Sequence, residues 1–162
     1  MIEITPEVIA RLDALQSEYM DALSRKDMDA WLATFDTQGA YICKTLEAEE
    51  RGLEIAFILD DCYDRLKDRV LFVTRVWVGT FQDYQPRHFA QRVSCRSVGN
   101  DLIEMRSSFS VMFTRSDTKK TEVFAAGQYV DLISMAQEKP LFRSKTAITD
   151  APLMAHYMAY PI

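Results

Sequence analysis

The sequence predicts an α+β fold in which helices come first and a long antiparallel sheet comes last. Residues 5–24 carry apolar side chains at helical spacing. Residues 88–149 contain four long strands, separated by short polar turns, along which side chains alternate. A strongly curved, mainly antiparallel sheet wrapped around the N-terminal helices is therefore expected, within one domain that spans residues 1–162.

The first helix is expected to begin at Thr5 and Pro6 and to end near Ser24. Threonine is a good N-cap, and proline fits the first helical position because its missing N–H would be unpaired there anyway. Asp27 is expected to cap a second, short helix that carries four apolar residues: Met28, Trp31, Leu32 and Phe35. These helices can cover one side of the sheet.

The middle of the chain gives weaker signals. A strand over residues 41–45 is followed by a charged segment, residues 47–52, that we interpret as a loop. Apolar residues at helical spacing predict a helix over residues 53–72, and two aspartates at positions 60 and 61 leave a break there open. Within this helix Asp61 and Arg65 are four apart and can pair. The segment that follows remains open as a short strand or a surface loop, residues 74–84.

The four long strands are expected at residues 88–98, 101–115, 121–135 and 139–149. The second places Met105, Ser107, Phe109, Val111 and Phe113 on one face. The third is apolar on both faces, with Val123, Ala125, Gly127 and Tyr129 on one side and Phe124, Ala126, Val130 and Leu132 on the other. A sheet that is apolar on both faces must be covered on both, so we expect another subunit to cover part of the side that the helices leave open.

Composition excludes several classes of function. A net charge of −5 argues against a nucleic-acid partner, which requires clustered lysine and arginine. No apolar run reaches the roughly 18 residues that span a bilayer, and the N-terminus shows no signal-peptide pattern. Three widely separated cysteines, Cys43, Cys62 and Cys95, are typical of reduced thiols in a cytoplasmic protein.

Metal and phosphate motifs are not recognisable in the sequence. A Rieske cluster requires two cysteines and two histidines in paired motifs, and neither His88 nor His156 has such neighbours. A two-histidine, one-carboxylate iron site would require both of these histidines to converge. The sequence also lacks a glycine-rich phosphate loop and the common hydrolase motifs.

What remains is a loose set of titratable residues that could line a cone between helices and sheet: Tyr19, Asp36, His88, Asp131 and Asp150. Small cone-shaped enzymes that move protons use such groups as acid and base. We favour structural over catalytic roles for these residues. His88 is then satisfied by a local partner, and Asp131 points outward near a strand end.

The sheet arginines and the C-terminal segment are both candidates for contacts with another subunit. Four arginines are expected on the sheet, either on a solvated face or as bidentate partners of carboxylates across a subunit boundary: Arg87, Arg92, Arg96 and Arg106. The C-terminal segment, residues 150–162, is rich in apolar residues and is expected to dock on its own sheet or on a neighbouring subunit.

Short segments along nearly the whole chain match one known family in order and spacing. They are residues 31–35 (WLATF), 40–42 (AYI), 51–53 (RGL), 66–70 (LKDRV), 87–89 (RHF), 107–111 (SSFSV), 123–131 (VFAAGQYVD), 147–150 (AITD) and 160–162 (YPI). The chain resembles the small, or beta, subunit of Rieske-type aromatic-ring-hydroxylating dioxygenases. It departs from the pattern in the last strand, where Leu141-Phe142-Arg143 replaces a usual Trp-Arg and Lys145 to Asp150 replaces a usual Arg-x-Val-x-Leu-Asp.

The resemblance implies a cystatin-like or NTF2-like cone without catalytic, cofactor-binding or metal-binding residues of its own. It implies a catalytic alpha subunit that holds a Rieske [2Fe–2S] cluster and a mononuclear Fe(II). Three beta subunits would form a trimer beneath three alpha subunits, and a reductase or ferredoxin would supply electrons to the alpha subunit. The complex would hydroxylate an aromatic ring, and the likeness is greatest to enzymes of benzoate-like acids such as salicylate, anthranilate or terephthalate.

Two alternatives remain open at this point. The chain could be a stand-alone NTF2-like isomerase or dehydratase that uses His88 and an aspartate as acid and base, in an enclosed polar cavity. It could also be a cone that binds a ligand without a reaction, in a cavity lined by apolar residues.

Overall fold

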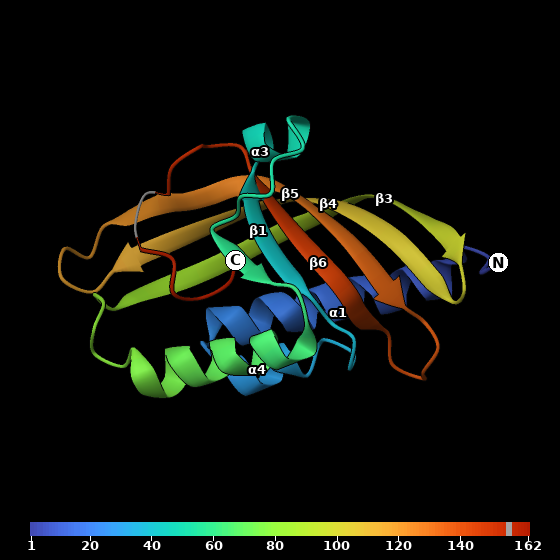
Figure 1. Ribbon diagram of the computed structural model, residues 1–162, viewed down its shortest axis with the longest axis horizontal. Helices are drawn as coiled ribbons and strands as arrows, with labels where there is room; N and C mark the ends of the chain where they lie inside the picture. The colour runs from blue at the N-terminus through green and yellow to red at the C-terminus, as the bar shows by residue number, and fades with distance from the viewer. Residues whose placement is uncertain (155–156) are drawn as a thin grey trace.

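The structure is a computed structural model that describes residues 1–154 and 157–162. One six-stranded sheet has the strand order β2-β1-β6-β5-β4-β3 (Figure 1). Its strands are β1 (Tyr41–Thr45), β2 (Ile58–Asp60), β3 (Tyr84–Gly99), β4 (Leu102–Arg115), β5 (Thr121–Ser134) and β6 (Leu141–Thr149). Only the β1–β6 pair is parallel among these neighbours, so the predicted α+β fold with a mainly antiparallel sheet is confirmed.

The helices α1 (Pro6–Ser24) and α4 (Tyr63–Leu71) lie together on one side of the sheet (Figure 1). Thr5 caps α1 by accepting a hydrogen bond from the Val8 N–H, as its position predicts. Asp27 caps the short α2 (Met28–Leu32) through the N–H of Ala30. The apolar stripe of α1 enters the core with Leu12, Leu15, Tyr19, Ala22 and Leu23.

The segment between β1 and α4 differs from prediction. The charged segment that we interpreted as a loop forms α3 (Leu46–Glu50), because the Thr45 side chain accepts a hydrogen bond from the Ala48 N–H and so caps a helix. The predicted helix over residues 53–72 is only half present. Its first part instead reaches β2, whose pairing with β1 satisfies both backbones and overrides the helical spacing, and α4 begins after Cys62.

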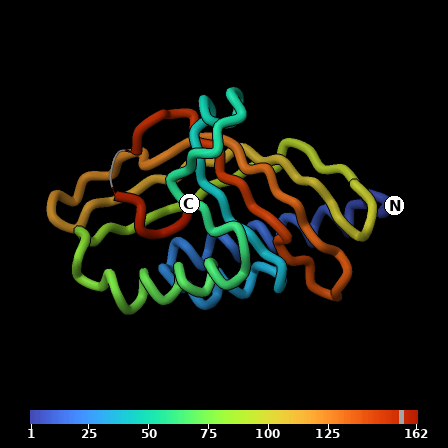
Figure 2. Tube along the Cα trace, in the orientation of Figure 1, coloured from blue at the N-terminus to red at the C-terminus, as the bar shows by residue number. Residues whose placement is uncertain are grey.

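The sequence leaves residues 74–84 undecided between a short strand and a surface loop. They begin within a turn of π-helix, η1 (Phe72–Val76), which continues directly from α4. The strand β3 then begins at Tyr84, four residues before the predicted start, and Tyr84 is buried. The long hairpins of β3, β4 and β5 run over the helices as one curved surface (Figure 2).

A register shift in β5 changes which side chains face the core. Between Val111 and Met112 on β4, the partner strand contains one extra residue, Phe124. This bulge turns Phe124 inward, where its ring lies 6.1 Å from that of Tyr84 in a stacked arrangement, whereas Val123 is 54% exposed. The predicted alternation was therefore wrong for these two residues, although Ala125 and Tyr129 face the core as expected.

Gly127 marks a close approach between strands. A Cβ built at this position would lie 1.9 Å from the main-chain oxygen of Ile148 on β6. A glycine in mid-strand is typical of a bulge or a bend, but the register shifts of β5 lie elsewhere, at Phe124 and next to Leu132. Glycine is required here because the curved sheet brings two backbones together.

The end of the chain, residues 157–162, lies near the middle of the molecule in Figure 2. Ala159 and Ile162 are buried, and Met154, Met158 and Tyr160 pack against the core. The described part of the C-terminal segment thus docks on its own domain, one of the two outcomes expected. Its apolar residues close the side of the core that α1 and α4 leave open.

Candidate functional site

An ion pair occupies the interior of the cone. Asp131 on β5 and Lys145 on β6 face each other in register, with 2.8 Å between Oδ2 and Nζ. Lys145 also donates to Oε1 of Gln16 on α1 at 2.9 Å. Lys145 is 0% exposed and Asp131 1%, so Asp131 is not the outward residue that the sequence led us to expect.

Three aromatic rings surround the Lys145 ammonium. Nζ lies 3.9 Å from the ring centre of Tyr129, 4.3 Å from Phe142 and 4.5 Å from Tyr19. These distances fit cation–π contacts, which are stronger when the cation is removed from water. The charge is therefore held by one carboxylate, one amide and three ring faces.

Burial shifts the pKa of both partners. It raises the pKa of Asp131 to about 6, and the nearby Lys145 opposes this rise. Burial likewise lowers the pKa of Lys145, and the attraction of Asp131 opposes that fall. Both shifts have desolvation as their largest cause, which is the pattern of a buried structural pair.

Two tyrosines hold the end of the chain in the same interior. The hydroxyls of Tyr19 and Tyr41 both donate to the main-chain oxygen of Ile162, at 2.7 Å and 2.9 Å. The Ile162 N–H donates to the Tyr41 hydroxyl at 3.0 Å. Burial raises the pKa of each tyrosine well above its ordinary value, so both remain protonated donors.

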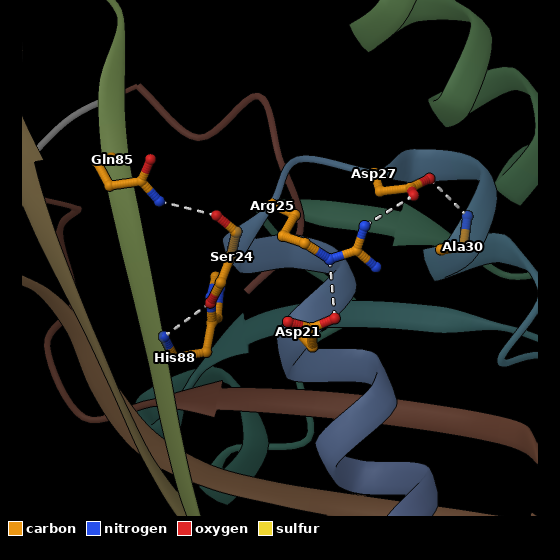
Figure 3. A network of polar contacts seen from close by, with 7 residues as sticks. All are labelled: Asp21, Ser24, Arg25, Asp27, Ala30, Gln85 and His88. Atoms are coloured by element: carbon orange, nitrogen blue, oxygen red, sulfur yellow. Dashed lines mark hydrogen bonds and ion pairs between the residues drawn. The ribbon is translucent and has the colours of Figure 1, made fainter.

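His88 lies away from this pair, beside the end of α1 (Figure 3). Its Nδ1 is 3.1 Å from the Ser24 hydroxyl, and its backbone N–H donates to the same oxygen at 3.3 Å. Burial alone lowers the pKa of His88 to about 4, with no contribution from a carboxylate. The partner is a serine 64 positions away in the sequence, and the ring's Nε2 is buried without a hydrogen-bond partner, so the expectation that a local group satisfies His88 was wrong. A serine is also not the carboxylate that an acid–base pair needs. Figure 3 also shows that the nearby Asp21 and Asp27 bind Arg25.

The remaining predicted candidates are dispersed. Asp36 pairs with Arg143 at 2.7 Å, and the backbone N–H of Asp150 donates to the Ala126 carbonyl while its side chain is exposed. His156 lies outside the described residues. The structure thus brings Tyr19 and Asp131 around Lys145 and leaves Asp36, His88 and Asp150 at separate places.

Sequence reasoning missed Gln16 and Lys145 as members of this interior cluster. A signal for Lys145 was available, because it alternates with Ala147 and Thr149 on the inward face of β6 and lies opposite Asp131 across the hairpin. Gln16 carried no comparable signal, since a polar residue on a helix is ordinarily exposed.

Three of the four predicted sheet arginines pair with carboxylates within the chain, whereas Arg87 donates to the main-chain oxygen of Pro86. Arg92 forms a bidentate contact with Asp13 of α1, at 2.8 Å and 3.2 Å, and Arg96 binds Glu104 of the neighbouring strand in the same way. Arg106 also approaches Glu104, at 3.5 Å. The carboxylate partners that were considered across a subunit boundary are thus found, for these arginines, inside the chain.

The side of the sheet opposite the helices remains open in this chain. We call it the outer sheet face and define it by Phe89, Met112, Val123, Ala126 and Val130, which alternate with inward residues. Phe89 is 57% exposed, and Val93, at a register shift beside this face, is 68% exposed. The same face also carries polar residues, among them Arg96, Glu104 and Gln128, so it is a mixed surface. Large exposed apolar side chains on such a face are typical of an interaction surface.

Two other kinds of site are absent from the described residues. They contain no group of three or more histidine, cysteine, aspartate or glutamate side chains placed to hold a metal ion. None of the helices among them is both long enough and apolar enough to span a membrane.

Comparisons with known proteins agree on one family. The family model described as "Ring hydroxylating beta subunit" matches residues 20–156. Subunit beta 2 of the terminal oxygenase component of terephthalate 1,2-dioxygenase from Comamonas sp. is 25% identical over 94% of this chain and 97% of its own length.

Solved structures give the same result for the fold. A crystal structure assigned to the beta subunit of an aromatic-ring-hydroxylating dioxygenase from Novosphingobium aromaticivorans has a TM-score of 0.83 and 25% identity, covering 94% of this chain and 95% of that one. A protein with a cystatin-like fold from Nostoc punctiforme has a TM-score of 0.67 and 16% identity, covering 94% and 98%, which confirms the cystatin-like cone. With its family model matched over most of its length, the chain belongs to the ring-hydroxylating beta subunit family.

Proposed function

We propose that this chain is the structural, non-catalytic beta subunit of a multicomponent Rieske non-haem iron aromatic-ring-hydroxylating oxygenase. One observation carries the proposal: the cone interior holds the buried Asp131–Lys145 pair and the chain's own tail, while large apolar side chains such as Phe89 and Val123 are exposed on the outer sheet face. A buried ion pair closed by its own partners and a docked tail favour a structural interior. Exposed large apolar side chains provide a surface for assembly.

The proposed assembly is an alpha3beta3 hexamer in the cytoplasm. The beta chain, as a single domain over residues 1–162, contacts other beta subunits in a trimer and supports the catalytic alpha subunit. The Rieske [2Fe–2S] cluster and the mononuclear Fe(II) belong to the alpha subunit, which receives electrons from a reductase or ferredoxin. Family membership supports this arrangement, and the beta chain supplies no ligand to either iron site.

The substrate class that we propose for the complex is a benzoate-like aromatic acid. Its support is the likeness to the beta subunit of terephthalate 1,2-dioxygenase over nearly the full length of both chains. The aromatic ring and its carboxylate would be bound on the alpha subunit, so the choice among acids rests with that chain.

Co-expression with the large subunit encoded beside this chain tests the assembly. The expected product is a red complex that contains iron and equal copies of two chains, with a native mass that corresponds to three of each. A colourless homo-oligomer that excludes the large subunit would contradict the proposal and return attention to the stand-alone alternatives.

Turnover per complex separates a structural chain from a catalytic one. His88→Gln and Asp131→Asn are expected to keep turnover within a few-fold of the parent complex whenever the hexamer forms. Loss of all turnover in an intact, iron-loaded hexamer carrying either change would show that the beta chain takes part in the chemistry.

Charge substitutions test the outer sheet face. Phe89→Asp and Val93→Asp should weaken assembly, because each would place a carboxylate inside an apolar contact. Ser17→Asp, on the exposed surface of α1, adds the same charge on the helical side and serves as the matched control. Analytical ultracentrifugation measures the assembly. Equal dissociation in all three variants, or in none, would show that this face is not the contact.

A further inference from the structure

The end of the chain binds inside the cone as a ligand would. Ile162 is 3% exposed, and its main-chain oxygen receives two hydroxyl hydrogen bonds from different elements, Tyr19 of α1 and Tyr41 of β1. Its N–H returns one bond to the Tyr41 hydroxyl. A buried main-chain oxygen requires hydrogen-bond partners, and here two converging, fully buried hydroxyls supply them.

A third donor lies beside these two. The indole N–H of Trp31, on α2, is buried and has no hydrogen-bond partner. It lies near enough to the Tyr19 hydroxyl to oppose the rise in that group's pKa. The rings of Trp31 and Tyr41 are 6.0 Å apart, edge to face. Two donors therefore meet at one acceptor, with a third, unpartnered donor beside Tyr19, and we call Tyr19, Trp31 and Tyr41 the donor cradle.

The cradle lies between the buried Asp131–Lys145 pair, whose Nζ is 4.5 Å from the Tyr19 ring centre, and apolar groups near the tail. Burial raises the pKa of the nearby Cys43 thiol to about 12, so it is neutral, and its Sγ lies 4.0 Å from the sulfur of Met158 in the tail. A surface hollow of about 270 Å³ borders the preceding part of the tail and is lined by Trp77, Thr80, Phe81, Tyr157, Met158 and Ala159.

We propose that the donor cradle is a binding site for a small apolar molecule that carries a carbonyl or carboxylate oxygen, and that residues 160–162 occupy it in the absence of that molecule. Ile162 indicates the class of ligand, since it combines a branched apolar side chain with an oxygen acceptor. Hydroxyl and indole N–H donors in a dry site favour such an oxygen, and the apolar groups near the tail favour the attached hydrocarbon. This site is additional to the assembly role and does not depend on it.

The test compares the full chain with a variant that lacks residues 160–162, each purified with whatever subunits accompany it. Equilibrium dialysis measures binding of two probes, the carboxylate 4-methylpentanoate and the neutral ketone 4-methylpentan-2-one. The shortened variant should bind one or both, at one molecule per chain, at least tenfold more tightly than the full chain, because the tail competes at high effective concentration. Binding of the carboxylate alone, or of the ketone alone, identifies which oxygen the cradle accepts.

Tyr19→Phe with Tyr41→Phe, introduced into the shortened variant, is the matched control. It keeps both rings and removes both hydroxyls, so probe binding should fall at least tenfold. A peptide of residues 157–162, added in trans, should displace the probe. The proposal is overturned if the folded shortened variant binds neither probe, or if the loss of both hydroxyls leaves binding unchanged.

A second variant covers the case in which the shortened chain does not fold. Ile162→Gly retains the tail and removes only the side chain that fills the apolar part of the cradle. Cavities of this kind stay dry and accept small apolar molecules. The ketone should raise the melting temperature of Ile162→Gly and leave that of the parent unchanged. Equal shifts, or no shift in a folded Ile162→Gly variant, would overturn the proposal.

Discussion

Asp131 and Lys145 face each other across β5 and β6, 2.8 Å apart at their charged atoms and almost fully removed from water. The pair lies where a cone-shaped enzyme would hold its substrate, and Gln16 and three aromatic rings enclose it. Desolvation of two charges offsets much of their attraction, so the pair adds little net stability but makes each partner dependent on the other.

Removal of one partner should therefore be costly. Lys145→Ala would leave Asp131 buried without its counter-charge and is expected to lower the free energy of unfolding by about 3–5 kcal/mol. The double change Asp131→Leu with Lys145→Met should recover most of this loss, because it buries no charge. Urea denaturation measures both. Arg51→Met, which removes the exposed partner of Glu47, is the control and should cost less than about 0.5 kcal/mol. A double variant as unstable as Lys145→Ala would contradict this account.

His88 should make stability depend on pH below neutrality. Burial lowers its pKa from 6.5 to about 4, so between these values the unfolded chain binds more protons than the folded one. Stability contributed by neutral His88 is present above pH 6.5 and is lost as the pH falls toward 4, with a slope of up to about 1.4 kcal/mol per pH unit.

The measurement is the free energy of unfolding of the parent and of His88→Gln from pH 7.5 to pH 4. The difference between the two curves isolates His88 from other groups, including Asp131, whose raised pKa acts with the opposite sign in the same range. The parent should lose more stability than His88→Gln on acidification. Parallel curves would show that His88 does not titrate with folding.

The helices and strands were predictable where a single local signal, such as a helix cap or the alternation of side chains, determined the structure. Thr5 and Asp27 are good caps and begin helices as expected, and the alternation in β4 gives the inward set from Met105 to Phe113. The failures came from long-range pairing. Residues near Ile58 have helical spacing but pair with β1, and one extra residue at Phe124 reverses the alternation of β5.

The candidate site was less predictable than the fold. Alternation along β5 and β6 could have placed Asp131 and Lys145 together, but no local pattern announces a lysine that is buried completely. The convergence of Tyr19 and Tyr41 on Ile162 joins residues 143 and 121 positions apart, so it depends on how the sheet closes over the helices.

Gly127→Ala should be among the most destabilising small changes in the sheet. The added methyl group would meet the Ile148 carbonyl at 1.9 Å, so β5 and β6 must separate or the curvature must relax. We expect a loss of about 3 kcal/mol or more in the free energy of unfolding, in the range of severe overpacking. Ala126→Gly, one residue earlier, is the control and should cost about 1 kcal/mol, the usual effect of glycine in a strand. A loss for Gly127→Ala no larger than that of the control would mean that the sheet adjusts freely.

Two neighbouring ion pairs allow a direct comparison of burial. Asp60 on the edge strand β2 receives two hydrogen bonds from Arg69 of α4, at 2.9 Å and 3.2 Å, and their side chains are only 9% and 15% exposed. Asp61 pairs with Arg65 as predicted, at 3.4 Å, with both side chains more than half exposed. Asp60→Asn is expected to cost about 1–3 kcal/mol, because a bidentate, charge-assisted contact that holds β2 against α4 is lost.

Asp61→Asn should cost less than about 0.5 kcal/mol, since water replaces an exposed partner easily. Hydrogen exchange gives a local readout besides the global free energy. The amides of β2 that pair with β1 should exchange faster in Asp60→Asn than in Asp61→Asn, because β2 is a three-residue edge strand held on one side by β1 and on the other by Arg69. Equal exchange in the two variants would mean that the strand pairing alone fixes β2, and that the buried pair contributes only to α4.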